Sequence, residues 1–134
     1  MRYKFLPHVA DIKFRAKGRT LNKTFENAAL AVSDILLERK KIKRKLKKEI
    51  SIKGNDKESL LYNFLEEMIY LLDAENFVVA SAEVRIRKNT LKATLSGDAA
   101  ENYKAINHIK AATYAEMHVK KTAKGWEVQA VLDV

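Results

Sequence analysis

The sequence predicts a single α+β domain over residues 1–134, with two helices packed in a two-layer arrangement on one β-sheet of about seven strands, largely antiparallel or mixed. Two stretches repeat apolar residues at helical spacing, and most other apolar residues alternate with polar ones as in half-buried strands. The 134 residues contain no internal repeat and no linker-like segment, and one hydrophobic core can serve a chain of this length. Helices and strands in this order indicate the α+β class.

The amino-terminal third is predicted to form two short strands and a helix. The strands cover 2–5 and 11–18, and the alternation in the second strand leaves Asp11 on its polar face. Thr20 has the side chain and position of a helix N-cap, and the helix extends from residue 21 to about 38. Its buried stripe comprises Leu21, Phe25, Ala28, Ala29, Val32, Ile35 and Leu36.

The rest of the chain is predicted to form one strand, one helix and two hairpins. The strand is "EISIKG" at 49–54, and Asp56 caps the helix that follows. The first hairpin turns at 88–89 and the second near 124–125, because alternating segments flank both positions. The buried stripe of the helix comprises Leu61, Phe64, Leu65, Met68 and Leu72, and the core face of the last strand comprises Trp126, Val128, Ala130 and Leu132.

The composition excludes several classes of chemistry. The chain has no cysteine, which removes disulfides, thiolate nucleophiles and cysteine-ligated zinc. Its four glycines are too dispersed for a phosphate-binding loop, its three histidines lack the paired spacing of a zinc site, and no serine lies in a nucleophile elbow. No apolar run reaches the length of a signal peptide or a membrane span, so we expect a cytoplasmic protein. Little remains for an independent enzyme.

The positive charge is concentrated in one segment. The formal net charge is +9, and residues 39–48 carry eight basic side chains and no acidic one. Such a cluster attracts phosphate backbones, and the alternative is a solvated helix end followed by a lysine-rich connection. Ile42 and Leu46, four residues apart, predict that the segment is partly helical and rests on the core. The basic residues are Arg39, Lys40, Lys41, Lys43, Arg44, Lys45, Lys47 and Lys48.

Two carboxylates lie close together at the end of the sequence. Asp133 lies on the polar face of the last predicted strand, and Val134 follows it with a main-chain carboxylate about one strand rise away, some 3.4 Å. Asp11 would add a third oxygen donor if its strand were a neighbour. Three such donors would repel each other unless a cation such as Ca²⁺ or Mg²⁺ neutralised them. On spacing alone, a solvated and frayed terminus is the simpler interpretation.

Four sequence segments occur together in a characteristic order. They are "HVAD" at 8–11, "GNDKESLLYNFLEEMIYLLD" at 54–73, "IKAATY" at 109–114 and "GWEVQAVLDV" at 125–134. The set resembles the archease family, small proteins associated with tRNA-splicing ligation, and the resemblance covers nearly the whole chain. It implies an archease-like fold and a metal site, usually described with calcium, made by Asp11, Asp133 and Val134. It also implies a functional lysine, which is Lys110 here.

The resemblance further implies an accessory factor without catalysis of its own. Such a protein would activate the tRNA-splicing RNA ligase that joins 2′,3′-cyclic-phosphate and 5′-hydroxyl ends. It would promote guanylylation of the ligase and multiple turnover, with at most weak or indirect contact with tRNA. Two alternatives remain open: an RNA-binding or RNA-chaperone module that uses residues 39–48, and a metal-dependent phosphohydrolase that uses Asp11 and Asp133.

Several positions depart from the family's pattern or allow two interpretations. Val9 stands where the family usually has threonine, His108 where it commonly has an acidic residue, and Ala115 where it usually has histidine. None of the three is an oxygen donor of the implied metal set, so they concern the surface toward the partner. His8 could orient Asp11 or face the partner, while the simpler interpretation is a partly buried histidine hydrogen-bonded to the backbone.

Overall fold

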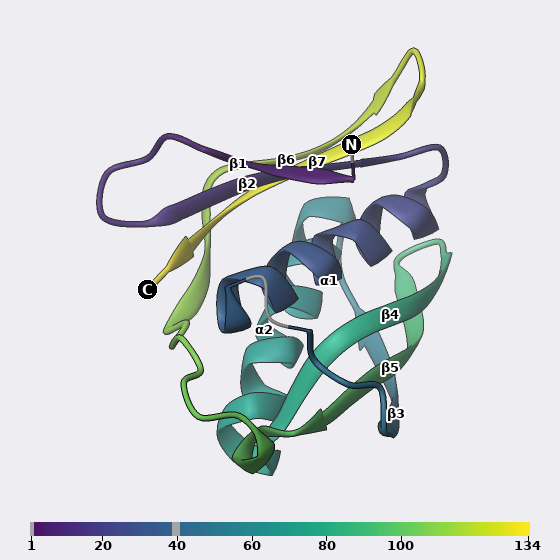
Figure 1. Cartoon of the computed structure of the whole chain (residues 1–134). Helices are drawn as coiled ribbons and strands as arrows, with labels where there is room; N and C mark the ends of the chain where they lie inside the picture. Colours follow the sequence, from purple (N-terminus) through teal and green to yellow (C-terminus); the bar gives the residue numbers. More distant parts are fainter. Residues whose placement is uncertain (1, 39–40) are drawn as a thin grey trace.

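The computed structural model describes residues 2–38 and 41–134, and within them two α-helices and seven strands form around one hydrophobic core (Figure 1). The helices are α1 (Leu21–Leu37) and α2 (Lys57–Glu75). The strands are β1 (Tyr3–Leu6), β2 (Ile12–Gly18), β3 (Leu46–Lys53), β4 (Phe77–Arg87), β5 (Thr90–Ala99), β6 (Ala111–Thr122) and β7 (Gly125–Asp133). The predicted α+β class and both predicted hairpins are confirmed.

The strands divide into two antiparallel sheets, one on each side of the helices (Figure 1). The first sheet has the order β1-β2-β7-β6 and the second has the order β3-β5-β4. β7 pairs with β2 along the whole of β2, from Ile12↔Leu132 to Gly18↔Trp126, so the two ends of the chain share the first sheet. The sequence predicted the strands within one sheet, because alternation identifies a strand but not its neighbour. The pairing of β2 with β7 within the first sheet brings residues near 11 and 133 together.

α1 packs against both sheets and is buried on most of its surface. Phe25, Ala28 and Ala29 are fully buried, and the small alanine side chains let the backbone of α1 approach the strands closely. The predicted N-cap is confirmed, since Thr20 Oγ1 accepts a hydrogen bond of 3.1 Å from the backbone N–H of Lys23. α1 ends at Leu37, where the next residue adopts the left-handed conformation with φ 35°.

The predicted helical character of the basic segment is wrong for the residues that the structure describes there. Residues 41–45 form no helix, and β3 begins at Leu46, which pairs with Gly97 of β5. Ile42 does rest on the core with 8% of its surface exposed, whereas Leu46 is 47% exposed. A helix would have stacked like charges at neighbouring turns, and pairing with β5 avoids that repulsion. Arg39 and Lys40 lie outside the described residues.

Polar side chains of the two helices cover the free edges of two outer strands. α1 covers β4, and α2 covers β6, so the unpaired backbone N–H groups of these edge strands find acceptors within the molecule. The four hydrogen bonds run from Val84 N to Glu26 Oε2 (2.9 Å), from Ile86 N to Asn22 Oδ1 (2.8 Å), from Ala112 N to Glu66 Oε2 (3.2 Å) and from Val119 N to Glu58 Oε2 (3.3 Å).

Candidate functional site

The end of the first sheet brings together the residues that the sequence predicted as metal ligands. The last β2–β7 pair is Ile12↔Leu132, so Asp11 and Asp133 are the next residues on neighbouring strands. Asp11 is partly exposed, with 32% of its side chain accessible, and Val134 is 39% exposed. Two carboxylates that are distant in sequence therefore lie at the same end of the sheet, directly beside Val134.

Lys110 lies at the same end, on the other side of β7. Its backbone N–H donates a hydrogen bond of 2.8 Å to the Asp133 carbonyl, immediately before Ala111 pairs with Asp133 at the start of β6. The Lys110 side chain is exposed. β7 is therefore flanked at its end by Asp11 on one side and by Lys110 on the other, as required if these residues act together.

Asp11 also borders an open groove of about 520 Å³ between the start of β2 and the carboxyl end of α1. Asp34 and Glu38 of this helix end line the same groove, so three acidic residues line it together with one basic residue, Lys13. Asn107 fixes the helix end: its backbone N–H donates to the Leu36 carbonyl (2.8 Å), and its side-chain amide donates to Glu38 Oε1 (3.1 Å). This acidic side of the site was not predicted, because nothing in the sequence places the end of α1 beside Asp11.

His8 connects Asp11 to β6, on the far side of β7. Its Nε2 lies 2.9 Å from Glu116 Oε2, and its Nδ1 lies 4.0 Å from Asp11 Oδ2. The expected hydrogen bond from His8 to the backbone is therefore replaced by a contact with a side chain. Lys13 Nζ donates to the other oxygen of Glu116 at 2.9 Å. The hydrogen bonds from Lys13 and His8, with their charges, lower the pKa of Glu116 from its usual value of 4.5.

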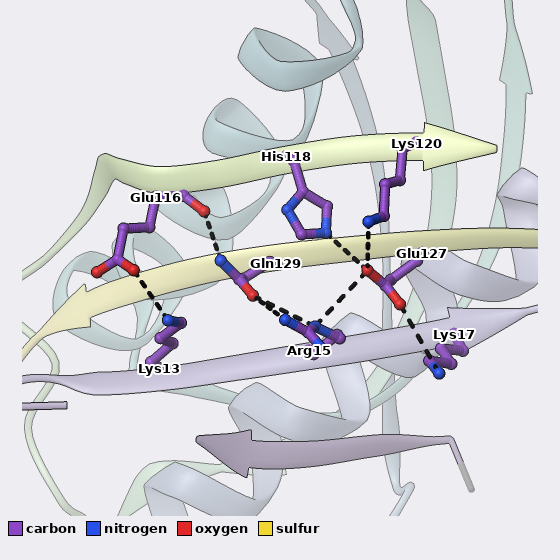
Figure 2. A network of polar contacts seen from close by, with 8 residues as sticks. All are labelled: Lys13, Arg15, Lys17, Glu116, His118, Lys120, Glu127 and Gln129. Carbon is purple, nitrogen blue, oxygen red and sulfur yellow. Dashed lines mark hydrogen bonds and ion pairs between the residues drawn. The ribbon is translucent and has the colours of Figure 1, made fainter. Parts of the chain in front are cut away.

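Sequence analysis missed Glu116 because the residue lies in a bulge. Between Thr113 and His118 the register of β6 with β7 shifts, and Glu116 has φ 53°. The bulge aims the Glu116 carboxylate toward β2, and its carbonyl accepts a 2.7 Å hydrogen bond from the Gln129 side chain (Figure 2). Alternation in "TYAEMHVKK" predicts a regular strand and carries no signal for this irregularity.

The outer face of the first sheet carries a continuous polar network in place of a further layer (Figure 2). At its centre is Glu127, whose side chain is only 8% exposed and has His118 Nε2 at 2.8 Å. Arg15 donates two hydrogen bonds to Gln129 Oε1, at 3.2 and 2.7 Å. Burial opposes ionisation of Glu127, but the His118 hydrogen bond and the charges of Arg15 and Lys120 outweigh it and lower the Glu127 pKa. This network fixes β2, β6 and β7 relative to each other, and with them the end that carries Asp11 and Asp133.

The donor set suits a hard cation. Asp11, Asp133 and the main chain of Val134 offer only oxygen, which Ca²⁺ and Mg²⁺ prefer, and a shell of about six to eight oxygens for Ca²⁺ leaves positions for water or for a partner's groups. In residues 2–38 and 41–134, no group of three His, Cys, Asp or Glu side chains is arranged to hold a metal ion. The expected ligand set contains only two carboxylate side chains, those of Asp11 and Asp133. Its third ligand is the main-chain carboxylate of Val134, so the set is not a cluster of three acidic side chains.

The positions that depart from the family pattern all lie on the surface. Val9 is 88% exposed, and His108 and Ala115 are exposed as well. They surround the end of the sheet, since Val9 precedes Asp11, His108 precedes Lys110 and Ala115 adjoins the bulge in β6. No helix in the described part of the chain is both long and apolar enough to cross a membrane.

The fold and the site define a small α+β protein in which two helices lie between two antiparallel sheets and in which aspartates near both ends of the chain lie at the same end of one sheet. The model of the Archease protein family matches residues 3–134. The chain belongs to the archease family.

Curated relatives and solved structures agree with this assignment. The "Protein archease" of Methanosarcina barkeri is 39% identical, over 98% of this chain and 95% of the relative. That of Pyrococcus furiosus is 38% identical, over 95% and 94%. The solution structure of protein 1598 of Methanobacterium thermoautotrophicum superposes with a TM-score of 0.80 at 24% identity, over 99% of each chain. The crystal structure of a Thermotoga maritima archease, described as a possible chaperone, gives 0.60 at 21%, over 98% and 96%. The two structures share the fold.

Proposed function

We propose that this protein is an accessory factor that activates the tRNA-splicing RNA ligase in the cytoplasm, by promoting guanylylation of the ligase and its multiple turnover. Membership of the archease family supports the proposal. The single observation that carries it is the pairing of β2 with β7, which sets Asp11 beside Asp133 and the end of the chain.

In this proposal Asp11, Asp133 and the Val134 main-chain carboxylate hold a divalent cation, Ca²⁺ or alternatively Mg²⁺. The cation would neutralise the carboxylates and bind phosphate oxygens or acidic groups at the partner's active site. Lys110, exposed on the far side of Asp133, would add a positive charge directed at the same phosphate. His8 would position Asp11 from the other side, through its contacts with Asp11 and Glu116. The ligase, not this chain, would carry the nucleotidyl-transfer chemistry.

A guanylylation assay with the ligase from the same source tests the function. The natural protein should raise the fraction of guanylylated ligase and the number of ligation cycles, whereas Asp11→Asn, Asp133→Asn and Lys110→Ala should abolish most of this stimulation. Asp73→Asn is the matched control, because Asp73 is exposed near the carboxyl end of α2 and is not one of the residues of the candidate site. Equal stimulation by all variants would overturn the role of the site. Metal-dependent phosphoester turnover by the chain alone would favour the hydrolase alternative.

Thermal denaturation tests the metal site without the ligase. Free Ca²⁺ at a hundred times Kd should stabilise the natural protein by about 2.7 kcal/mol relative to chelator. A chain extended by two residues beyond Val134 should gain much less from Ca²⁺ and should melt normally in chelator, because Leu132 and the rest of the core face are untouched. If the extended chain gains as much from Ca²⁺ as the natural one, the terminal carboxylate is not a ligand.

A further inference from the structure

Three neighbouring hollows follow one side of α1. The first, of about 600 Å³, and the second, of about 730 Å³, share Arg2, Leu30 and Arg44 in their walls. The second and the groove beside Asp11 share Asp34. The shared residues make one continuous depression that begins near the amino end of α1 and ends at the candidate metal site.

The floor of this depression is a single, partly buried stripe of α1. The helix residues in its walls recur at spacings of three and four, which is one face of an α-helix. β1 borders the stripe on one side, and the segment before β3 borders it on the other. The helix residues are Lys23, Glu26, Asn27, Leu30, Ser33, Asp34, Ile35 and Glu38.

The first two hollows are strongly basic, and apart from Lys23, which pairs with Glu26, their cations are available. Arg2, Arg44 and Lys47 make no ion pair with any residue in the described ranges, and the same holds for Lys41 and Lys43.

The acidic side chains of the first hollow are already engaged in contacts within the protein. Glu26 accepts from the Val84 N–H and pairs with Lys23 at 3.6 Å, and Glu83 pairs with Arg85 at 3.6 Å.

The basic wall is held in place by two contacts. Ile42 is anchored in the core, and the Lys43 N–H donates a 2.8 Å hydrogen bond to the Tyr103 hydroxyl. That hydroxyl in turn donates to Asp98 Oδ2 at 2.9 Å, and Asp98 is only 2% exposed. The backbone of residues 41–45 is therefore attached to the protein at defined points although it has no regular secondary structure, and it carries its cations along the wall of the hollow.

We propose that these two hollows bind the phosphate backbone of single-stranded RNA, without sequence preference. Unpaired cations along a concave track are suited to a phosphodiester chain, which releases its counterions on binding. The cations lie along a track between α1 and the segment before β3 rather than on a flat face, which favours a single strand over a membrane surface. At the Asp11 end the carboxylates repel phosphate, so the bound strand stops near Asp34 unless a cation is present. The proposal does not depend on the ligase.

Fluorescence anisotropy with a labelled oligouridine of about twelve nucleotides, titrated at several salt concentrations, tests the proposal on the full chain. The test variant is Arg2→Gln with Arg44→Gln, the two cations shared by both hollows. The control is Arg87→Gln with Lys92→Gln, which removes the same charge from the separate basic hollow at the β4–β5 turn. Melting temperatures of all three proteins show whether the variants remain folded.

The test variant should bind oligouridine several-fold more weakly than the natural protein. The plot of log binding constant against log salt concentration should become less steep by about 1.4, which is about 0.7 for each lost contact with a single strand. The control variant should bind like the natural protein. Equal weakening in both variants would show that net charge alone attracts the RNA, and it would overturn the proposal that the two hollows bind it. Binding to phosphatidylserine vesicles in place of oligouridine, or to duplex RNA only, would also overturn the proposal.

Discussion

Replacing Glu127 by glutamine tests whether the polar network on the outer face of the first sheet stabilises the fold. Glutamine keeps the shape and a hydrogen-bonding oxygen but removes the negative charge. The deleted charge receives the 2.8 Å contact from His118, and a hydrogen bond to a charged group contributes about 1.5–3 kcal/mol. Lys17 and Lys120 lie at 3.7 and 3.5 Å but are more than half exposed, so solvent screens them and each adds at most about 0.5 kcal/mol.

The net destabilisation of Glu127→Gln should therefore be about 2–3 kcal/mol, equivalent to a fall in Tm of about 6–15 °C for a domain of this size. Differential scanning calorimetry at neutral pH measures it. Glu83→Gln is the control, because the Glu83 side chain is 78% exposed and its ion pair with Arg85 lies at the surface, so the Tm of this variant should change little.

The pH dependence supplies a second, independent readout. The pKa of Glu127 is lowered in the folded protein from its usual 4.5, so its charge contributes stability above that pH and the contribution is lost as pH falls through the lower, folded pKa. The Tm difference between the natural protein and Glu127→Gln should therefore narrow below pH 4.5. A variant that melts within about 1 °C of the natural protein at neutral pH would refute the reasoning, as would a difference that stays constant into acid.

Three further changes probe other parts of the fold, each by urea denaturation unless stated. Thr20→Ala should cost about 1 kcal/mol, because the Lys23 N–H loses its acceptor at the start of α1; an unchanged midpoint would remove Thr20 as a cap. Gly97→Ala should lower the free energy of unfolding by about 2–3 kcal/mol, because a Cβ there would lie 2.1 Å from the Val78 carbonyl oxygen and β4 must shift; an unchanged midpoint would show that β4 can shift with little loss of stability. Tyr103→Phe should weaken oligouridine binding while Tyr70→Phe, at an exposed position of α2, should not, as measured by anisotropy.

The sequence predicts local structure well because each element has a local cause. Thr20 and Asp56 cap the helices as expected, and Asp56 forms a capping box with Ser59. The core face of β7 is confirmed at Val128, Ala130 and Leu132, all fully buried. What alternation cannot predict is which strands pair, because pairing joins residues as distant as 12 and 132. It also predicts Glu127 and Gln129 as exposed, whereas both are 6% exposed beneath long basic side chains from β2 and β6.

The candidate site was predictable only in part, for a related reason. Asp11, Asp133 and Lys110 were named from the family resemblance, and the pairing of β7 with β2 and β6 brings them to one end of the sheet. Glu116 and the end of α1 were missed, because a bulge and a helix terminus place them there rather than any motif. A long-range contact of the same kind is made by Tyr114, whose ring stacks on that of Tyr62 from α2, with centroids 4.2 Å apart.

The covering of the outer strands by helix side chains has a consequence for synthesis of the chain on the ribosome. α1 precedes β4 and α2 precedes β6, so each helix has been made before the strand whose backbone it will cover. When Val84 and Ile86 emerge, Glu26 and Asn22 are already available, and the same order holds for α2 and β6. A nascent strand with an open edge can pair with another chain and aggregate. Here the order of the elements shortens the time for which either edge waits uncovered.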